Sequence, residues 1–308
     1  MVKEVIGALV GHEGGRFIDG TVGEGGHAGA LLEAAGPRAR LLGLDRDPDA
    51  LALARERLAS LGERVRLMQG DFADLAELAP RAGWDRVDGI LLDLGLRSGA
   101  LDDPERGFAF GRPGPLDMRF DPSQGEPAAA FLARIRPDEL VRLLEEGTSR
   151  AAPRAIARAI LECRRRSRIA RTEDLVACLR AGLRGRATPK LLSSVFATLR
   201  MAVNDELGRL DRALATLPHL LNPGGVLCVI AYQSQEDRRA KNLRRSSFVD
   251  PLNGEPFRMA PLSAKPLRPS PQEVRENRRA RSARLRAFRR APPPEARQRR
   301  RGRRAPDA

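Results

Sequence analysis

A glycine-rich turn at residues 17–29 constrains the fold of this chain more than any other stretch. The apolar residues before Asp19 predict a short strand, and a helix is predicted to begin near His27. Between them the turn carries Gly20, Gly23, Gly25 and Gly26. Without side chains at these positions, a ligand can lie against bare backbone and its N–H groups. The stretch therefore predicts a ligand-binding turn between a strand and a helix.

An acidic residue follows at the spacing typical of nucleoside-cofactor sites. The apolar run at 41–44 predicts a neighbouring strand, and this strand ends in Asp45. A carboxylate at its tip can accept hydrogen bonds from both hydroxyls of a ribose. The glycine spacing does not choose the cofactor, because Gly23-x-Gly25-x-x-Ala28 also fits the dinucleotide pattern. NAD and S-adenosylmethionine both remain open at this point.

Length and composition indicate an ordinary globular chain. The 308 residues, 42% of them hydrophobic, suffice for one large domain or two smaller ones. No apolar run reaches the length of a membrane span and there is no signal-peptide pattern, so we expect neither a membrane protein nor a secreted one. Cys163, Cys178 and Cys228 show no metal-ligand spacing. We therefore expect a cytoplasmic protein with reduced cysteines and no metal.

The net charge of +15 is unevenly distributed. The segment from Arg275 to Arg304 holds fourteen arginines against Glu276 and Glu295, a net charge of +12, so the rest of the chain carries about +3. Arginine side chains pair readily with phosphate groups. The pattern therefore favours a polyanion-binding tail on a nearly neutral enzyme. A tail that only improves solubility is the alternative.

Predicted strands alternate with predicted helices in the first third of the chain. Strands are expected at 41–45, 65–68 and 87–92, and the last is apolar throughout, as in a strand buried on both faces. This alternation predicts a parallel α/β sheet with helices on both faces. The sheet is expected to resume at 226–232 and, after a loop-like stretch from 246, to end with a strand at 282–288.

The middle of the chain contains no good strand candidate. Helices are predicted at 128–135, 137–146, 151–166, 172–181 and 191–217. The predicted organisation has a first sheet part at 1–100, an inserted helical substrate-recognition domain at 101–187, a second sheet part at 188–290, and a disordered Arg/Pro-rich tail at 291–308.

Polar residues follow two of the predicted strands. Asp93 comes directly after the strand at 87–92, and the polar run at 232–238 follows the strand at 226–232. Two irregular segments, 106–110 and 114–119, add aromatic and charged residues. Ligands bind at the carboxyl edge of open parallel sheets. These segments together therefore predict a substrate pocket at that edge.

The motifs also resemble a known family in order and spacing. They are DGTVGEGGHAG, LDRDPDAL, DGILLDLG, RGFAF, GPLDMRFD, LRMAVNDEL, SQEDR and NRRARSARLR, and they extend from about Val2 to Arg290. They resemble the RsmH (MraW) methyltransferases. The resemblance implies a Rossmann-like class I methyltransferase sheet with an inserted all-helical domain. It also implies methyl transfer from S-adenosylmethionine to the N4 amine of a cytidine in small-subunit (16S) ribosomal RNA.

The resemblance assigns roles to individual residues. It implies that Gly25, Gly26 and His27 contact the cofactor, as expected also for Gly23, and that Asp45 binds the ribose. It places Phe72 beside the adenine and Asp93 at the methionine end, where Asp93 is also our catalytic candidate. For the substrate we expect stacking by Phe108, Phe110 or Tyr232 and polar contacts from Asp117, Ser234 or Glu236.

Two departures from the family pattern concern the site. Ala100 stands where the family usually has a glutamine, and Gln233 stands where it usually has a histidine. Three hypotheses therefore stay open. The chain is an rRNA cytidine methyltransferase, a diverged methyltransferase acting on another RNA or on DNA, or a non-catalytic RNA-binding module. No prediction of oligomeric state follows from the sequence.

Overall fold

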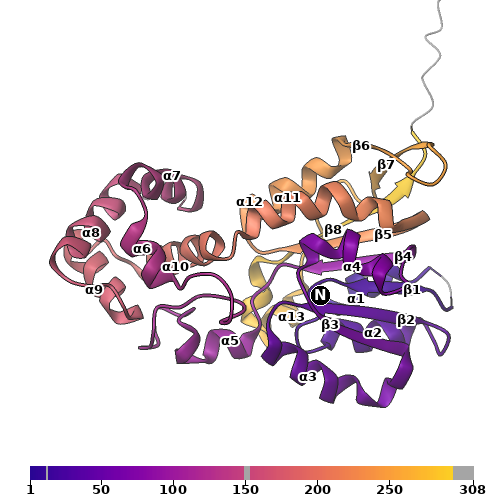
Figure 1. Ribbon diagram of the computed structural model, residues 1–308, viewed down its shortest axis with the longest axis horizontal. Coiled ribbons are helices and arrows are strands. Elements are labelled where there is room, and N and C mark those ends of the chain that lie inside the picture. The colour runs from indigo at the N-terminus through magenta and orange to yellow at the C-terminus, as the bar shows by residue number, and fades with distance from the viewer. Residues whose placement is uncertain (12, 149–152, 294–308) are drawn as a thin grey trace, which may run out of the picture.

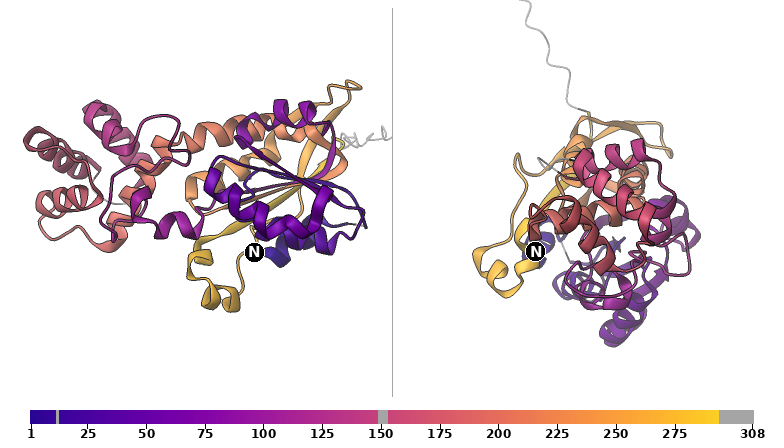
Figure 2. Two further views of the ribbon diagram at one scale, coloured as in Figure 1. Left: turned by 60° about the horizontal axis from the view of Figure 1, so that its bottom comes forward. Right: turned by 90° about the vertical axis from the view of Figure 1, so that its left-hand side faces the viewer.

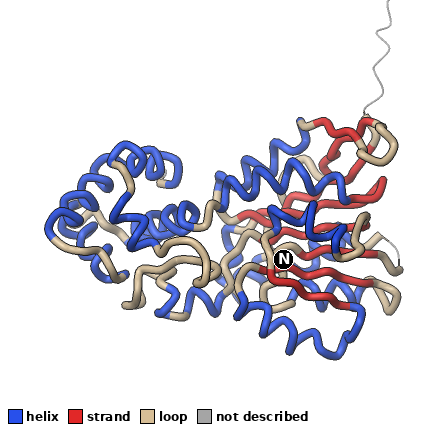
Figure 3. Tube along the Cα trace, in the orientation of Figure 1, coloured by secondary structure: helices blue, strands red, loops and turns tan. Residues whose placement is uncertain are grey.

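The computed structural model describes residues 1–11, 13–148 and 153–293. Its sheet has eight strands in the order β3-β2-β1-β4-β5-β8-β7-β6 (Figures 1 and 3). The strands are β1 (Arg16–Asp19), β2 (Arg40–Asp45), β3 (Val65–Gln69), β4 (Val87–Asp93), β5 (Leu221–Ala231), β6 (Ser247–Val249), β7 (Pro256–Pro261) and β8 (Arg284–Ala291). β1 to β5 pair in parallel, whereas β8, β7 and β6 add antiparallel pairings.

Helices cover both faces of the sheet because the strands bury side chains on both sides. In β1, Phe17 packs into one buried cluster and Ile18 into the other. The Phe17 side is covered by α1 (Val2–Leu9), α2 (Gly26–Ala34) and α3 (Pro48–Leu58). The Ile18 side is covered by α4 (Leu75–Arg81), α11 (Glu206–Thr216) and α12 (Ser234–Asn242). The predicted parallel α/β sheet is thus confirmed.

The helices between β4 and β5 form a separate lobe, drawn at the left of Figure 1 and standing beyond the end of the sheet in Figure 2. They are α6 (Ala128–Arg134), α7 (Pro137–Gly147), α8 (Pro153–Arg166), α9 (Thr172–Gly182) and α10 (Pro189–Val203), preceded by the short α5 (Ser98–Asp102). The buried side chains of α10, such as Val195 and Leu199, belong to the same apolar cluster as those of α6 to α9. We therefore propose that the lobe extends to Val203 rather than ending at 187.

Three predictions of local structure are wrong. The single helix predicted at 191–217 is two helices, because the chain breaks at Asn204 and Asp205, and Asp205 adopts a left-handed φ of 48°. The loop predicted after 246 contains the short strands β6 and β7; β7 pairs with β8, and β6 pairs with β7 at the edge of the sheet. Ala291, assigned to the tail, is the last residue of β8, whereas 294–308 lie outside the described residues.

The cysteines also differ from expectation. Cys163 in α8 and Cys178 in α9 form a disulfide, whereas Cys228 is a buried free thiol. The two helices pack against each other and bring the paired Cα atoms to 5.8 Å, within the range that a disulfide requires. The separation of 15 residues in the sequence did not by itself predict this disulfide, because the pairing depends on the packing of α8 against α9.

Among the described residues, no helix is long and apolar enough to cross a membrane. Within the same ranges, no group of three or more His, Cys, Asp or Glu side chains is arranged to hold a metal ion.

Candidate active site

A cavity of about 390 Å³ lies at the carboxyl edge of the parallel strands. Each of β1 to β5 contributes residues from its end or from the segment that follows it. The lining includes Gly20, Thr21, Gly23, Gly26, His27, Asp45, Phe72, Asp93, Ala100, Phe120, Glu206, Tyr232, Glu236 and Asn277. Residues from distant parts of the sequence therefore meet at one edge of the sheet.

The glycine turn after β1 forms one wall of this cavity. Gly23 and Gly26 line the wall, but Gly25 lies behind it, where a Cβ would be 2.9 Å from the Leu58 side chain. Gly25 has a left-handed φ of 81° and caps the N-terminus of α2. At Gly20, a Cβ would come within 2.7 Å of Leu92, so the strand end and the turn pack closely. Gly25 thus shapes the turn from outside the cavity.

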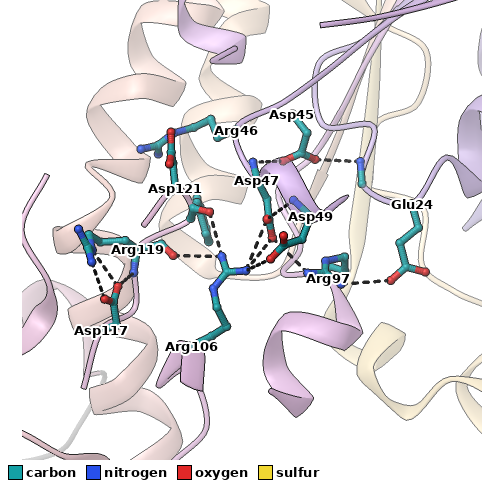
Figure 4. Close-up of polar contacts among 12 residues, drawn as sticks. Glu24, Asp45, Arg46, Asp47, Asp49, Arg97, Arg106, Asp117, Arg119 and Asp121 are labelled. Carbon is teal, nitrogen blue, oxygen red and sulfur yellow. Dashed lines mark hydrogen bonds and ion pairs between the residues drawn. The ribbon is translucent and has the colours of Figure 1, made fainter. Parts of the chain in front are cut away.

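Asp45, at the end of β2, is held by the backbone on both of its oxygens (Figure 4). Oδ2 accepts a hydrogen bond from the Gly23 N–H at 2.8 Å, and Oδ1 accepts one from the Asp47 N–H at 2.9 Å. Burial raises the pKa of the Asp45 carboxyl above its ordinary value, and these N–H groups oppose the rise. Each carboxylate oxygen can still accept a further hydrogen bond from a ligand hydroxyl.

Asp93, at the end of β4, has a different environment. Its backbone N–H donates to the Thr21 hydroxyl at 2.6 Å, and its Oδ1 accepts from the Gly95 N–H at 3.2 Å. The Nδ1 of His27 lies 3.8 Å from Oδ2. Burial, together with a hydrogen bond to Asp93, raises the pKa of the Tyr232 hydroxyl, so this group is a neutral donor to the carboxylate. Burial also lowers the pKa of His27, which favours a neutral imidazole beside Asp93.

Two phenylalanine side chains line the cavity, one from the sheet domain and one from the lobe. Phe72 follows β3 in a short 3-10 helix that Asp71 caps, and it packs partly against the sheet core. Phe120 comes from the lobe and was not predicted as a site residue. Its N–H donates to Oδ1 of the buried Asn204 at 2.9 Å, and the Asn204 amide donates to the Met118 carbonyl at 2.7 Å. One buried amide therefore fixes the loop that carries Phe120.

The predicted substrate residues are not all brought to the cavity. Tyr232 and Glu236 line it. Phe108 is buried in the lobe with its ring centroid 6.0 Å from that of Phe120, and Phe110 packs edge-on against Phe196. Neither ring lines the cavity, because Phe108 is packed inside the lobe and Phe110 lies against Phe196.

The two remaining predicted contacts also lie elsewhere. Asp117 forms a two-pronged ion pair with Arg119 at 2.9 and 2.7 Å and does not line the cavity. Ser234 is the exposed first residue of α12. Both side chains are outside the cavity wall, so neither is placed to touch a ligand there.

Carboxylates complete the wall, and one of them, Glu206, was not singled out from the sequence. Glu206 pairs with Arg200 through two bonds of 2.7 and 2.9 Å. Oε2 of Glu236 accepts the N–H groups of Tyr232 and Gln233 at 2.8 and 2.9 Å. Burial, helped by the nearby Glu206, raises the pKa of Glu236 to about 7. The motif LRMAVNDEL contained the signal for Glu206, since it supplies both members of the pair.

A second carboxyl group missed from the sequence lies beneath the turn. Asp19 is 2% exposed, and its Oδ1 accepts the Thr21 N–H at 3.1 Å. Burial raises the pKa of Asp19 to about 7, and the charges of Asp93 and Asp45 add to the rise. The only sequence signal was its position at the end of the first predicted strand.

Buried ion pairs fasten the lobe to the cavity rim (Figure 4). The guanidinium of Arg106 bonds to both Asp47 oxygens at 3.4 and 3.2 Å. It also donates to the Arg119 and Phe120 carbonyls at 3.2 and 2.9 Å. Arg97 lies 3.3 Å from Asp47 and 3.8 Å from Glu24 of the glycine turn. These contacts tie the lobe, the segment after β4 and the glycine turn to the N-cap of α3.

Comparison with known proteins finds relatives along most of the chain. The chain is 44% identical over 291 residues to "Ribosomal RNA small subunit methyltransferase H" of Thermomicrobium roseum, which covers 91% of this chain and 89% of that protein. A relative of the same name in Methylococcus capsulatus is 43% identical over 297 residues, which covers 93% of this chain and 98% of the relative. A solved SAM-dependent O-methyltransferase from Thermotoga maritima aligns over 96% of this chain and 66% of its own at 13% identity, with a TM-score of 0.40.

The chain also matches a protein family. The sequence profile described as the MraW methylase family matches residues 1–291, which include every strand of the sheet and the whole lobe. On this match, and on the relatives above, the chain belongs to the MraW methylase family.

Proposed function

We propose that this chain transfers a methyl group from S-adenosylmethionine to the N4 amine of a cytidine in small-subunit (16S) ribosomal RNA. One observation carries the proposal. Asp45 and Asp93 end two strands of one parallel sheet and face a single cavity, in a chain of the MraW methylase family. Because the substrate is ribosomal RNA, we place the reaction in the cytoplasm.

The cavity fits S-adenosylmethionine in size and in the chemistry of its wall. Its volume of about 390 Å³ is in the range of small-molecule sites. Asp45 offers two acceptor oxygens for a ribose, and Phe72 offers an apolar face for an adenine. The turn at Gly23 and Gly26 leaves backbone accessible beside a methionine chain. When bound, S-adenosylmethionine supplies an electrophilic methyl group.

The amine of cytosine needs help because its lone pair is delocalised into the ring. An acceptor that binds the N4 hydrogens favours the geometry in which the lone pair points at the methyl carbon. Asp93 is the best-placed acceptor, since Tyr232 and the Gly95 N–H hold its carboxylate at the strand end. With the methyl group supplied by the bound cofactor, Asp93 would accept the proton that N4 loses and pass it to solvent.

The base must be unstacked and held while this happens. Tyr232 and Phe120 are the aromatic residues placed on the cavity wall for this role, in place of Phe108 and Phe110. No hydrogen bond within the described residues engages Oε1 of Glu236, so this oxygen is available to a polar edge of the base. We assign Tyr232, Phe120 and Glu236 to the substrate.

A methyltransferase acting on another RNA or on DNA is the second candidate. It is favoured by Ala100, which lines the cavity where a glutamine is usual in the family, and by Gln233 at the start of α12. A missing polar side chain changes which groups the wall can bind, so a different nucleoside is the expected consequence.

The test is methylation of defined substrates followed by mass spectrometry of the nucleosides. The protein is incubated with methyl-labelled S-adenosylmethionine and either 16S ribosomal RNA, small ribosomal subunits, another RNA or DNA. Label recovered as N4-methylcytidine from 16S RNA supports the proposal. Label on another nucleoside or another nucleic acid supports the second candidate. Cofactor binding without any transfer, in a preparation saturated with each substrate, contradicts both.

A further inference from the structure

The lobe contains a concentration of positive charge that the chain average conceals. Residues 153–190 hold eleven Arg and Lys residues against three acidic residues, a net charge of +8. With +12 at 275–304 and +15 overall, the rest of the chain is therefore at −5. The protein is not a nearly neutral enzyme with one basic tail. It has two basic regions on an acidic body.

Most of these cations are exposed and unpaired. Nine of the eleven are exposed and form no ion pair within the ranges that the structure describes. They are Arg154, Arg158, Arg165, Arg166, Arg168, Arg180, Arg184, Arg186 and Lys190. The other two are engaged: Arg164 donates to the Leu132 and Ile135 carbonyls, and Arg171 pairs with Glu173. We call the nine the lobe cations.

The neighbouring helix α7 shows the contrasting case. There Arg142 pairs with Asp138 at 3.2 Å, and Arg136 pairs with Glu139 at 2.8 Å. The exposed cations at α7 are thus paired locally, whereas most of those on α8 and α9 are not. Uncompensated like charges repel one another on a folded surface, and this repulsion is relieved when an anion binds.

Three of the lobe cations form a regular row. Arg154, Arg158 and Arg165 are four and seven residues apart, so they lie on one face of α8. With Pro137 and Val141 of α7, they line a groove of about 340 Å³. A row of guanidinium groups beside a shallow groove suits an extended chain of phosphates, because each fork can bond two phosphate oxygens.

We propose that the lobe cations bind the phosphodiester backbone of the RNA at a distance from the methylated nucleotide. The inference rests on the proposed function and adds a second contact surface to it. In Figure 1, α8 and α9 lie at the end of the lobe away from the sheet, and the side view in Figure 2 shows the same separation. An RNA that reaches both this end and the cavity must extend along the lobe. The surface therefore selects for long or folded RNA and contributes nothing to binding of a short fragment.

The experiment compares two triple variants of equal charge change. The lobe variant is Arg154→Gln, Arg158→Gln and Arg165→Gln. The control is Lys3→Gln, Arg40→Gln and Arg55→Gln, three exposed cations of the sheet domain that form no ion pair with any described residue. Affinity for a 16S ribosomal RNA transcript is measured as a function of salt. Because the lobe variant removes three phosphate contacts, its log–log slope should be smaller by about 2, and its binding about a hundred-fold weaker near 0.1 M salt. The control should keep the slope of the unmodified protein.

A kinetic arm separates remote contact from damage to the cavity. For the lobe variant, the KM of the long RNA should rise. A short single-stranded fragment that carries the target cytidine should be methylated with the same kinetics by the lobe variant and by the unmodified protein. Equal slopes for both variants, or equal decreases in activity on the long and short RNA, would overturn the inference. So would unchanged affinity for RNA with activity abolished only on assembled subunits, which indicates an acidic protein partner. If the unmodified protein methylates no RNA, the proposed function fails, and the binding measurement still decides the lobe surface.

Discussion

Asp45 and Asp93 end two strands of the same sheet, yet their surroundings suit them to different tasks. Both oxygens of Asp45 are held by backbone N–H groups, which fixes the carboxylate as a rigid acceptor. Asp93 instead faces side chains that can exchange hydrogen bonds, Tyr232 and His27. A rigid acceptor suits a ribose that stays unchanged, and an adaptable one suits an amine that changes its geometry during reaction.

Asp45→Ala should weaken binding of S-adenosylmethionine roughly ten- to a hundred-fold, because charged hydrogen bonds are worth about 1.5–3 kcal/mol. Isothermal calorimetry measures the change directly. Asp85→Ala is the matched control, since Asp85 is an exposed carboxylate just before β4, at the opposite edge of the sheet. Affinity within twofold of the unmodified protein would remove Asp45 from the cofactor site.

Asp93→Asn should reduce single-turnover methyl transfer by about a hundred-fold or more, the scale expected for one preorganised electrostatic group. The substitution keeps the shape of the side chain, removes its charge and replaces one acceptor with a donor. Cofactor affinity should change by less than about tenfold. A variant that binds cofactor poorly but transfers at the normal rate when saturated would assign Asp93 to binding alone.

Asp19→Asn should stabilise the fold at alkaline pH relative to acidic pH. The folded-state pKa of Asp19 is raised to about 7 from 3.8, so the native state keeps a proton that the unfolded state has released. The stability that this bound proton contributes is fully present below pH 4. As the pH rises to about 7, it is lost, and the free energy of unfolding falls by up to about 4 kcal/mol. Urea denaturation at pH 5 and pH 8 should show the variant gaining on the unmodified protein. A pH-independent difference would contradict the burial argument.

At the scale of the elements, the periodicity of apolar residues correctly predicted the strands and helices that form the core of the sheet. The strands β1 to β5 and the helices on both faces follow from apolar runs and their spacing. The break at Asn204 could not be predicted, because the apolar pattern of α10 continues into α11 without a proline or glycine at the break. Nor could the place of β7 in the sheet, because β7 pairs with β8, which begins more than twenty residues after it.

The site was predictable where a residue ends a strand or closely follows it. Asp45, Phe72, Asp93 and Tyr232 all lie on the cavity for that reason. Phe120, Asn204 and Glu206 take their places only through packing of the lobe against the sheet, which no local pattern reveals. For the same reason the sequence did not show that Phe108 and Phe110 lie away from the cavity wall, since a loop sequence does not show which of its aromatic residues turn inward.

Arg106→Ala should destabilise the junction between lobe and sheet by about 1–3 kcal/mol, because two carbonyls lose their buried donor and Asp47 keeps only Arg97 as a cationic partner. Arg112→Ala is the control. Arg112 forms an exposed pair with Asp102, so its removal should cost less than about 1 kcal/mol. Urea denaturation followed by circular dichroism compares the two. Equal midpoints for both variants would mean that the buried pair does not fasten the lobe.

At the scale of the whole molecule, the lobe cations lie apart from the cavity in which we propose that methyl transfer takes place. Six acidic residues and only two arginines line the cavity, whereas cations gather on the lobe and in the C-terminal part of the sequence. A distribution of this kind lets RNA be attracted at a distance and released without strong binding at the reacting nucleotide.

Truncation after Pro293 removes six arginines and leaves β8 complete. It should weaken RNA binding and reduce the salt slope by about 0.7 for each phosphate contact that is removed, without changing affinity for the cofactor. Identical slopes for the full and truncated chains would mean that these residues do not contact RNA. The comparison uses the same 16S transcript for both chains.

The lobe enters and leaves the sheet domain at neighbouring points. It is inserted between β4 and β5, which lie side by side in the sheet, and Asn204 at its exit bonds to the Phe120 segment near its entry. An insertion whose ends are already close adds little loop-closure cost, whatever its size. In evolutionary terms the lobe is therefore an insertion that could be exchanged as a unit. A descendant of this chain could exchange it for another RNA-binding insertion and keep Asp45 and Asp93 at the edge of the sheet, provided that the new insertion replaces Phe120 on the cavity wall.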